Sequence, residues 1–305
     1  MSDSLRFLEA IIGQHAAVSS IRRALRLRAL SDGQQKQPVT FVFAGPEGCG
    51  KGFAANRLAQ HGERERPILR IAMGTYQSDN EAAGLIGLRA IYNGARPGLL
   101  TAFVRENPDA LIIFEDFDRA HPNVQDVLAP MLGRGVLTDQ CGFFEGDPRN
   151  GVQIAPPEVD FSRALIVFTT ALGRKLYDDE RWLEEVVAKP GLLNSALIQS
   201  VSEETSDHFS EDQSAVGRAL MAELAKAEWV LFNRLDMAAL LAVARQQFDS
   251  LDAMAQRAGF SGVRLGDGSE AAVRELLTAI VLANGPEPKP ALLVAADLAR
   301  TYLAP

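Results

Sequence analysis

The chain has 305 residues, 47% of them hydrophobic, with a formal net charge of −8 and a sequence pI near 5.2. This length and composition indicate a globular protein with room for one large and one smaller domain, and the acidic balance argues against a nucleic-acid partner, which needs a basic surface. The first residues lack a basic segment leading into an apolar run, no apolar stretch approaches the roughly 18 residues of a membrane span, and Cys49 and Cys141 are the only cysteines. We therefore expect a cytoplasmic protein without membrane contact or disulfide framework.

Short apolar runs alternate with helical patterns through the first half of the chain. Nearly continuous apolar runs are typical of strands buried on both faces of a parallel sheet. They lie at residues 39–44, 68–72, 111–114 and 165–169. The helical patterns lie at residues 18–30, 53–59, 99–105 and 123–132. This alternation predicts an α/β fold in which helices cover a parallel sheet as a three-layer sandwich.

The hydrophobic pattern weakens between residues 178 and 213. Residues 201–213 carry several acids but no Lys or Arg, which predicts an exposed or mobile loop. We therefore assign residues 174–228 to a divergent insertion within a large domain that covers residues 1–236.

Helical periodicity dominates again from Met237 onward, where apolar residues recur at spacings of three and four. Further helices are expected at residues 270–283 and 290–302. Residues 237–305 are therefore predicted to form a small, mainly helical C-terminal domain.

Residues 45–52, Gly-Pro-Glu-Gly-Cys-Gly-Lys-Gly, contain every part of a phosphate-binding P-loop except one hydroxyl. In a P-loop, backbone N–H groups and a helix N-terminus surround a polyphosphate, the lysine reaches the terminal phosphates, and a Ser or Thr hydroxyl binds Mg²⁺. Lys51 is present, but Gly52 replaces the hydroxyl residue. The segment lies between an apolar strand and a helix, so it predicts binding of ATP or ADP and leaves Mg²⁺ short of one ligand. The alternative is a glycine-rich turn that binds nothing.

Two acids, Glu115 and Asp116, follow the apolar run at residues 111–114. In a nucleotide-hydrolysing sheet, one carboxylate at a strand end helps to hold Mg²⁺ and the next orients the attacking water. Acids at strand ends also occur in ordinary turns, but the glycine loop favours the functional interpretation. We therefore predict that both acids are catalytic and that Glu115 is the metal ligand.

With these motifs the chain resembles the Clp-type AAA+ unfoldases and disaggregases, most closely the second ATPase ring of the ClpB and ClpA proteins. Residues 11–18 are similar to the family's Ile-Gly-Gln motif, residues 115–124 to its Asp-Glu-x-Glu-Lys-Ala-His-Pro-Asp-Val block, and residues 135–139 to its Gly-Arg-Leu-Thr-Asp turn. The resemblance covers nearly the whole chain and implies an AAA+ P-loop fold with a C-terminal lid domain. It implies a nucleotide-binding set of Gly13, Gln14, Gly45, Pro46, Glu47, Gly48, Cys49, Gly50, Lys51, Gly52 and Phe53.

The resemblance also assigns roles to Tyr92 and Arg234. Tyr92 matches the pore-facing tyrosine of the family's Gly-Tyr-x-Gly loop, although Ile91 replaces the first glycine; such an aromatic suits non-specific contact with a threaded protein substrate. The alternative is a loop tyrosine packed against its own domain. Residues 229–236 resemble Pro-Glu-Phe-Leu-Asn-Arg-Ile-Asp, which makes Arg234 an arginine finger and implies a ring, such as a hexamer, of like subunits. The alternative is an arginine in a surface ion pair.

The chain departs from the family at the positions that serve hydrolysis. Gly52 lacks the metal-binding hydroxyl. The two acids occur in swapped order, with Glu115 where the family has the metal-side Asp and Asp116 where it has the catalytic Glu. The shorter side chain leaves the Asp116 carboxylate about one C–C bond behind the position of the catalytic Glu. Ala171 replaces the sensor asparagine, and Glu287 replaces the second sensor arginine. These changes predict slow or absent hydrolysis, because positioning and charge stabilisation carry most of phosphoryl-transfer catalysis.

The first hypothesis is an assembly or regulatory subunit in protein remodelling that binds nucleotide, either as a homo-oligomer or with another AAA+ or adaptor protein. The second is an active ATP-driven unfoldase that threads a protein substrate past Tyr92. A third, a nucleic-acid machine with an AAA+ core, is disfavoured by the acidic pI and by the Clp-specific motifs.

Overall fold

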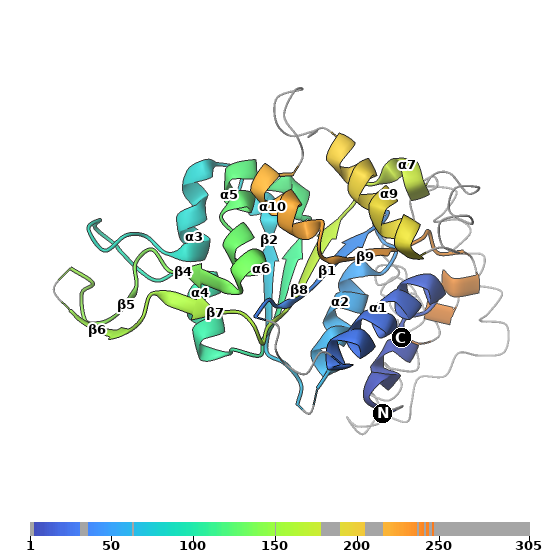
Figure 1. Cartoon of the computed structure of the whole chain (residues 1–305), viewed down its shortest axis with the longest axis horizontal. Coiled ribbons are helices and arrows are strands. Elements are labelled where there is room, and N and C mark those ends of the chain that lie inside the picture. The colour runs from blue at the N-terminus through green and yellow to red at the C-terminus, as the bar shows by residue number, and fades with distance from the viewer. Residues whose placement is uncertain are drawn as a thin grey trace, which may run out of the picture.

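The predicted strands form one parallel sheet in the computed structural model, and a fifth strand joins them (Figure 1). The strands are β1 (Val39–Ala44), β2 (Ile68–Ala72), β3 (Leu111–Glu115), β8 (Leu165–Thr170) and β9 (Glu228–Leu231). Their order across the sheet is β2-β3-β8-β1-β9. The structure describes residues 3–30, 36–62, 64–149, 151–177, 190–204, 216–236, 238–240, 242–243 and 246.

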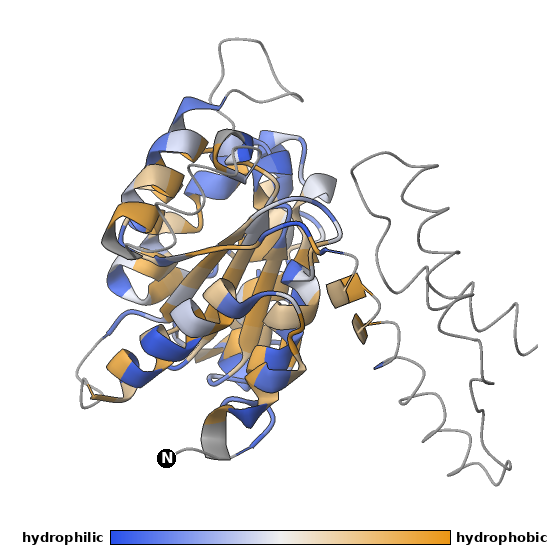
Figure 2. Ribbon diagram, turned by 90° about the vertical axis from the view of Figure 1, so that its right-hand side faces the viewer, coloured by the Kyte–Doolittle hydropathy of each residue, from blue (hydrophilic) through white to orange (hydrophobic). Residues whose placement is uncertain are grey.

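Successive residues of the central strands enter two different hydrophobic cores, one on each face of the sheet. Along β1, Phe41 and Phe43 belong to one core and Val42 to the other. Side chains alternate between the faces of a strand, so a strand with no polar residues buries both faces. Figure 2 shows these hydrophobic strands between two layers of helices. The prediction of a three-layer α/β sandwich is confirmed.

Helices of the first layer come from the N-terminal part of the chain, and those of the second layer come mainly from later segments. The first layer contains η1 (Asp3–Ala10), α1 (His15–Leu30), α2 (Lys51–Arg57) and η2 (Leu58–Gln60). The second contains α3 (Ala82–Ile86), α4 (Leu99–Glu106), α5 (Pro122–Asp126), α6 (Ala129–Arg134), α7 (Arg174–Tyr177), α9 (Pro190–Glu203) and α10 (Arg218–Leu224). Short 3-10 turns lie at η3 (Met73–Thr75), η4 (Asp79–Glu81) and η5 (Phe117–Arg119).

Two short antiparallel pairs lie outside the main sheet. Strand β4 (Val136–Thr138) pairs with β7 (Glu158–Asp160), and β5 (Phe143–Glu145) pairs with β6 (Val152–Ala155). The β5–β6 hairpin projects from the body of the domain (Figure 1). Its tip approaches the loop that carries Tyr92, because the Arg149 guanidinium donates to Asn93 Oδ1 at 2.9 Å.

Strand β2 and the helix predicted at residues 123–132 differ from the sequence prediction. In β2 only Ile71 is buried, and Ile68 is 38% exposed, because β2 is the edge strand of the described sheet. The predicted helix is divided into α5 and α6, and Pro130 lies in the first turn of α6. Proline removes an N–H donor and fits only the first turn of a helix, which explains the division.

The insertion at residues 174–228 contains more regular structure than its sequence pattern indicates. It holds α7, α9 and α10, and its last residue begins β9. Leu197 and Val201 of α9 are fully buried in the second core. The prediction of an exposed loop is therefore wrong for residues 201–203, which complete α9, whereas residues 205–215 lie outside the described residues.

The predicted C-terminal lid at residues 237–305 lies outside the described residues, apart from residues 238–240, 242–243 and 246, so that domain stays a prediction. Glu287 falls in the same part of the chain. Among the helices that the structure describes, none is long and apolar enough to cross a membrane.

Candidate nucleotide site

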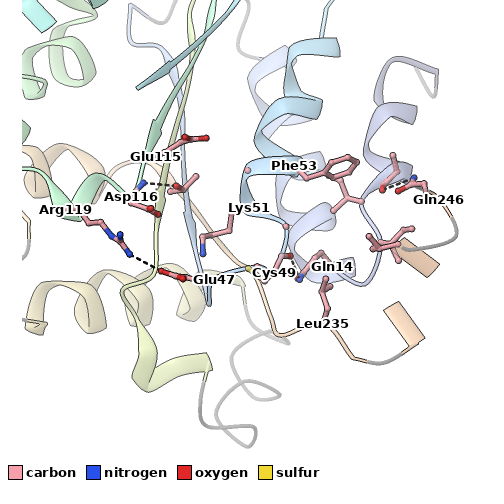
Figure 3. Close-up of a pocket in the computed structure, with 18 residues that line it drawn as sticks. Gln14, Glu47, Cys49, Lys51, Phe53, Glu115, Asp116, Arg119, Leu235 and Gln246 are labelled. Carbon is pink, nitrogen blue, oxygen red and sulfur yellow. Dashed lines mark hydrogen bonds and ion pairs between the residues drawn. The ribbon is translucent and has the colours of Figure 1, made fainter. Parts of the chain in front are cut away.

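A cavity of about 520 Å³ lies at the carboxyl ends of β1, β3 and β8 (Figure 3). From β1 the chain passes to β2, beyond β8 and β3, whereas from β8 it passes to β9 on the other side of β1, so the connections that leave these two neighbouring strands run in opposite directions. Open α/β sheets bind ligands at such a switch point, and this volume suits a nucleotide-sized ligand. The predicted site residues that line the cavity are Gln14, Glu47, Gly48, Cys49, Gly50, Lys51, Gly52, Phe53, Glu115 and Asp116.

The glycine loop passes close to the backbone of the segment after β9. Gly45 has a φ of +148°, and a Cβ there would lie 2.3 Å from the Phe232 carbonyl oxygen. Only glycine fits that position, because any side chain would displace one of the two segments. Gly52, by contrast, has open space: a Cβ there would meet no atom of the described residues within 4 Å.

Lys51 begins α2, and its side chain folds back over the loop. It is 8% exposed, and its ammonium group donates to the carbonyl oxygens of Gly45 and Pro46, the latter at 2.7 Å. A cation in this position faces the space that a terminal phosphate takes in a P-loop. The loop carbonyls therefore hold the Lys51 ammonium group inside the pocket.

Gln14 connects the glycine loop to the segment that carries Arg234. Its amide nitrogen donates to the carbonyls of Cys49 at 3.0 Å and Asn233 at 2.7 Å, and its amide oxygen accepts from the Asn233 N–H at 3.0 Å. The preceding Gly13 has room for no side chain, since a Cβ would lie 2.6 Å from the Ala239 Cβ. Gln14 therefore fixes the backbone of Cys49 and that of Asn233 relative to each other at this wall of the pocket.

The two acids at the end of β3 make different contacts. Glu115 forms an ion pair with Arg70 of the neighbouring strand β2. Asp116 has a φ of +48°, in the left-handed region that side chains seldom adopt, and its N–H donates to Thr169 Oγ1 at 3.1 Å. Strained backbone of this kind is found most often at functional sites. Asp116 lines the cavity together with Lys51 (Figure 3).

Asp118, near this site, is a half-buried residue with one buried carboxylate oxygen, and the sequence patterns did not single it out. Its Oδ1 has no hydrogen-bond partner among the described residues. Burial raises the pKa of Asp118 above its ordinary value of 3.8, and the charge of Asp116 adds to this, while a hydrogen bond from Thr170 opposes it. Burial disfavours the charged form of an acid, so at neutral pH this carboxylate destabilises the fold.

We expect Asp118→Asn to raise the free energy of unfolding by about 1 kcal/mol near pH 7. The pKa of Asp118 is raised in the folded state, so the native protein binds more protons than the unfolded chain. The stability that the wild-type protein draws from this group therefore falls as the pH rises above about 3.8. The gain should therefore shrink as the pH is lowered toward 4. Thermal unfolding at several pH values measures it, with Glu106→Gln, at the exposed last residue of α4, as the control; a gain that does not change with pH would contradict the charge argument.

Ala171 follows β8, where the family places its sensor asparagine. Its carbonyl oxygen accepts a hydrogen bond from the Tyr177 hydroxyl at 2.6 Å. The Glu204 carboxylate accepts from the N–H groups of Gly173 at 2.7 Å and Arg174 at 3.1 Å. The loop after β8 is thus held by the insertion, and the Ala171 methyl group offers no hydrogen bond to a nucleotide.

Both cysteines are free thiols and buried. Cys49 is 1% exposed within the glycine loop, and burial raises the pKa of its thiol. Burial also raises the pKa of Cys141. Because the thiolate is the reactive form, these geometries fit structural rather than catalytic roles.

Tyr92 and Arg234 lie away from the cavity. Tyr92 is 51% exposed and Ile91 is 75% exposed, on a loop closed by an antiparallel bridge between Leu88 and Arg96. Arg234 is exposed, next to the backbone that Gln14 holds, and is not among the described residues that line the cavity of its own chain. The structure therefore leaves both side chains accessible.

Sequence reasoning missed two arginines that pair with acids lining the cavity. Arg70 pairs with Glu115, and Arg119 pairs with Glu47 of the loop at 3.0 Å. Arg119 lines the cavity. Arg119 falls within the family block at residues 115–124 and could have been flagged as a cation near the acids, whereas the Arg70 contact depends on the register of β2 against β3.

The fold and the cavity together define a P-loop nucleotide-binding protein of the α/β class. Residues 36–237 match the family model described as AAA domain (Cdc48 subfamily). The chain therefore belongs to the AAA+ family, and its relatives place it with the Clp-type ATPases.

The relatives give the degree of similarity. The chain is 30% identical over 239 residues to chaperone protein ClpB of Nitratidesulfovibrio vulgaris, an alignment that covers 74% of this chain and 25% of that protein. It is 32% identical over 203 residues to the ATP-dependent Clp protease ATP-binding subunit ClpC of Staphylococcus epidermidis, covering 65% of this chain and 23% of that protein. The chain thus spans about a quarter of the length of these relatives.

A cryo-electron-microscopy reconstruction of closed-state Hsp104 with ATPγS and FITC-casein shares the fold. The TM-score is 0.65 at 18% identity, and the match covers 97% of this chain and 45% of that chain. At this identity the similarity establishes the fold alone.

Proposed function

We propose that this chain binds ATP or ADP, hydrolyses ATP slowly or not at all, and acts as an assembly or regulatory subunit in protein remodelling. The observation that carries the proposal is the contrast within one pocket. The glycine loop and Lys51 form a closed phosphate cradle, whereas Gly52, Asp116 and Ala171 stand where hydrolysis requires a hydroxyl, a longer carboxylate and an amide.

Binding is supported by the charge and shape of the cavity. Lys51 is held in the pocket by the loop carbonyls, and the backbone of residues 45–50 curves around it. Backbone N–H groups of such a loop, with a lysine beside them, are the usual ligands of a polyphosphate. Family membership and the ClpC relative, which is named as an ATP-binding subunit, agree with a nucleotide ligand.

Slow hydrolysis follows from the positions of the reacting groups. Asp116 reaches about one C–C bond less far than a glutamate, and a misplacement of about 1 Å can lower a rate about 100-fold. Ala171 cannot orient a water molecule or contact the γ-phosphate. The residues that would hold Mg²⁺ do not fit that ion, because Gly52 has no oxygen and Glu115 is paired with Arg70.

A role in an assembly is supported by the accessible Arg234 and Tyr92. An arginine finger reaches the nucleotide of a neighbouring subunit, so it must be exposed in the single chain, as Arg234 is. The partners are then further copies of this chain, another AAA+ protein or an adaptor, with a protein as substrate. A cytoplasmic location stays a prediction.

The test is to measure nucleotide binding and Mg-ATP turnover of the same preparation. A typical enzyme rate of about 1 s⁻¹ lowered about 100-fold becomes roughly one turnover per minute or less. We expect saturable ADP and ATP binding with turnover at or below that rate. Turnover of several per minute that disappears on Lys51→Ala would refute the proposal.

An active unfoldase is the second candidate, favoured by the exposed Ile91 and Tyr92 on one loop. It requires turnover that an unfolded protein stimulates and that Tyr92→Ala removes. Leu99→Ala, at a residue 50% exposed at the start of α4, is a matched control for loss of an exposed apolar side chain. The same assay therefore separates the two candidates.

A further inference from the structure

We infer that this pocket binds its nucleotide without Mg²⁺, and that the Arg119 guanidinium supplies part of the positive charge that the metal would bring. The inference rests on the proposed nucleotide binding and deepens it, since it concerns how the charge of the phosphates is balanced.

The pocket lacks one of the oxygen ligands that a metal needs. A P-loop binds Mg²⁺ through the hydroxyl of the residue after the lysine and through a carboxylate at a strand end. Gly52 has no side-chain oxygen, and apart from its chain neighbours Lys51 and Phe53 no side chain of the described residues lies within 4 Å of a Cβ built there, so none supplies an oxygen in place of the hydroxyl. Mg²⁺ requires near-octahedral coordination, so the loss of this ligand weakens its site.

The carboxylate predicted to hold the metal is already engaged. Glu115 is paired with Arg70, and the sheet register explains why: Ala72 lies opposite Glu115, so Arg70 is the diagonal neighbour two residues earlier on the same face of β2. The guanidinium already balances the charge of Glu115. To bind a metal, this carboxylate would first have to leave its arginine.

Arg119 is the cation placed to take over from the metal. The Arg119 Nη2 donates to Glu47 Oε1 at 3.0 Å, and both side chains line the cavity beside Lys51 (Figure 3). These side chains are 44% and 65% exposed, and an ion pair in contact with water is weak. A phosphate carries more charge than Glu47 and accepts two parallel hydrogen bonds from a guanidinium, so it displaces the carboxylate.

The stem of Arg119 restricts where its guanidinium can move. A Cβ built on Gly74 would lie 3.6 Å from the Cβ and Cδ of Arg119, so the stem is close to the backbone of η3. The guanidinium can therefore exchange Glu47 for a phosphate by rotating its outer bonds. Together, Lys51 and Arg119 provide two cations at the phosphate end of the pocket.

The experiment titrates the full chain with a fluorescent N-methylanthraniloyl ADP and ATP, once with Mg²⁺ and once with EDTA. For the wild type we expect dissociation constants that agree within roughly threefold. Arg119→Ala should weaken binding in EDTA by about tenfold, because a charge-assisted contact is lost. Glu47→Gln should tighten binding, because it frees Arg119 and removes a negative charge from the pocket.

Arg134→Ala, at an exposed arginine in the last turn of α6 outside the cavity, is the matched control and should leave binding unchanged. Binding that EDTA weakens tenfold or more would overturn this inference and leave the proposed function standing. Arg119→Ala binding no weaker than Arg134→Ala would also overturn it. If the wild type binds neither nucleotide in either buffer, the proposed function itself fails. The wild-type comparison in the two buffers decides the matter even if a variant does not fold.

Discussion

Replacing Lys51 with alanine is expected to weaken ADP and ATP binding by about 100-fold while the fold stays intact. The ammonium group is the buried cation of the pocket, 8% exposed and held by the carbonyls of Gly45 and Pro46. A charge-assisted contact with phosphate oxygens contributes about 2 to 3 kcal/mol, which corresponds to roughly 30- to 150-fold in affinity. Isothermal titration calorimetry measures the loss directly.

The stability of this variant should change little. The variant loses two hydrogen bonds to the carbonyls of buried residues, but Lys51 lines the cavity, so truncating its side chain lets water reach those carbonyls. We therefore expect a change in the free energy of unfolding below about 1 kcal/mol. Lys226→Ala is the matched control, since that lysine is 70% exposed and pairs only with Glu223 of α10 among the contacts described. If Lys51→Ala and Lys226→Ala bind nucleotide equally well, the cavity is not a phosphate site.

Much of the fold could be predicted because the central strands carry their signal locally. The runs at residues 39–44 and 111–114 are apolar at every position or nearly so, which only strands buried on both faces require. Strand β9 was missed because Glu228–Leu231 is four residues long and lies within a motif that was interpreted only for Arg234. The break between α5 and α6 could have been predicted, because Pro130 marks it in the sequence.

The candidate site also has one part that the sequence predicts and another part that it does not. The glycine loop and the acids after β3 are contiguous in sequence, so their place at the carboxyl edge of the sheet followed from the strand assignment. The pairs Arg70–Glu115 and Arg119–Glu47 join residues 45 and 72 positions apart. Such contacts depend on strand register and loop closure, which no local pattern specifies. The Arg70 contact changes the prediction for Glu115, because the carboxylate that was assigned to a metal already forms an ion pair with this arginine.

Restoring the family residues should convert this pocket into a faster ATPase. The variant combines four substitutions: Gly52→Thr, Glu115→Asp, Asp116→Glu and Ala171→Asn. Gly52 has room for the new side chain, and the swap of the acids moves the water-orienting carboxylate forward by about one C–C bond. We expect Mg-ATP turnover to rise roughly 10- to 100-fold, and less for any single change, because residues that act on one chemical step do not contribute additively.

These substitutions should also lower the stability of the protein, through the change at Asp116. Its φ of +48° suits an aspartate better than a glutamate, so the swap is expected to lower the free energy of unfolding by about 1 kcal/mol. Adding Lys51→Ala to the repaired chain should abolish the gained turnover, which excludes a contaminating ATPase. The repaired chain should also bind nucleotide more tightly with Mg²⁺ than with EDTA, unlike the wild type. If it binds Mg-ATP but turns over no faster than the wild type, the altered residues do not limit hydrolysis, and the cause must lie in the lid or in a missing partner subunit.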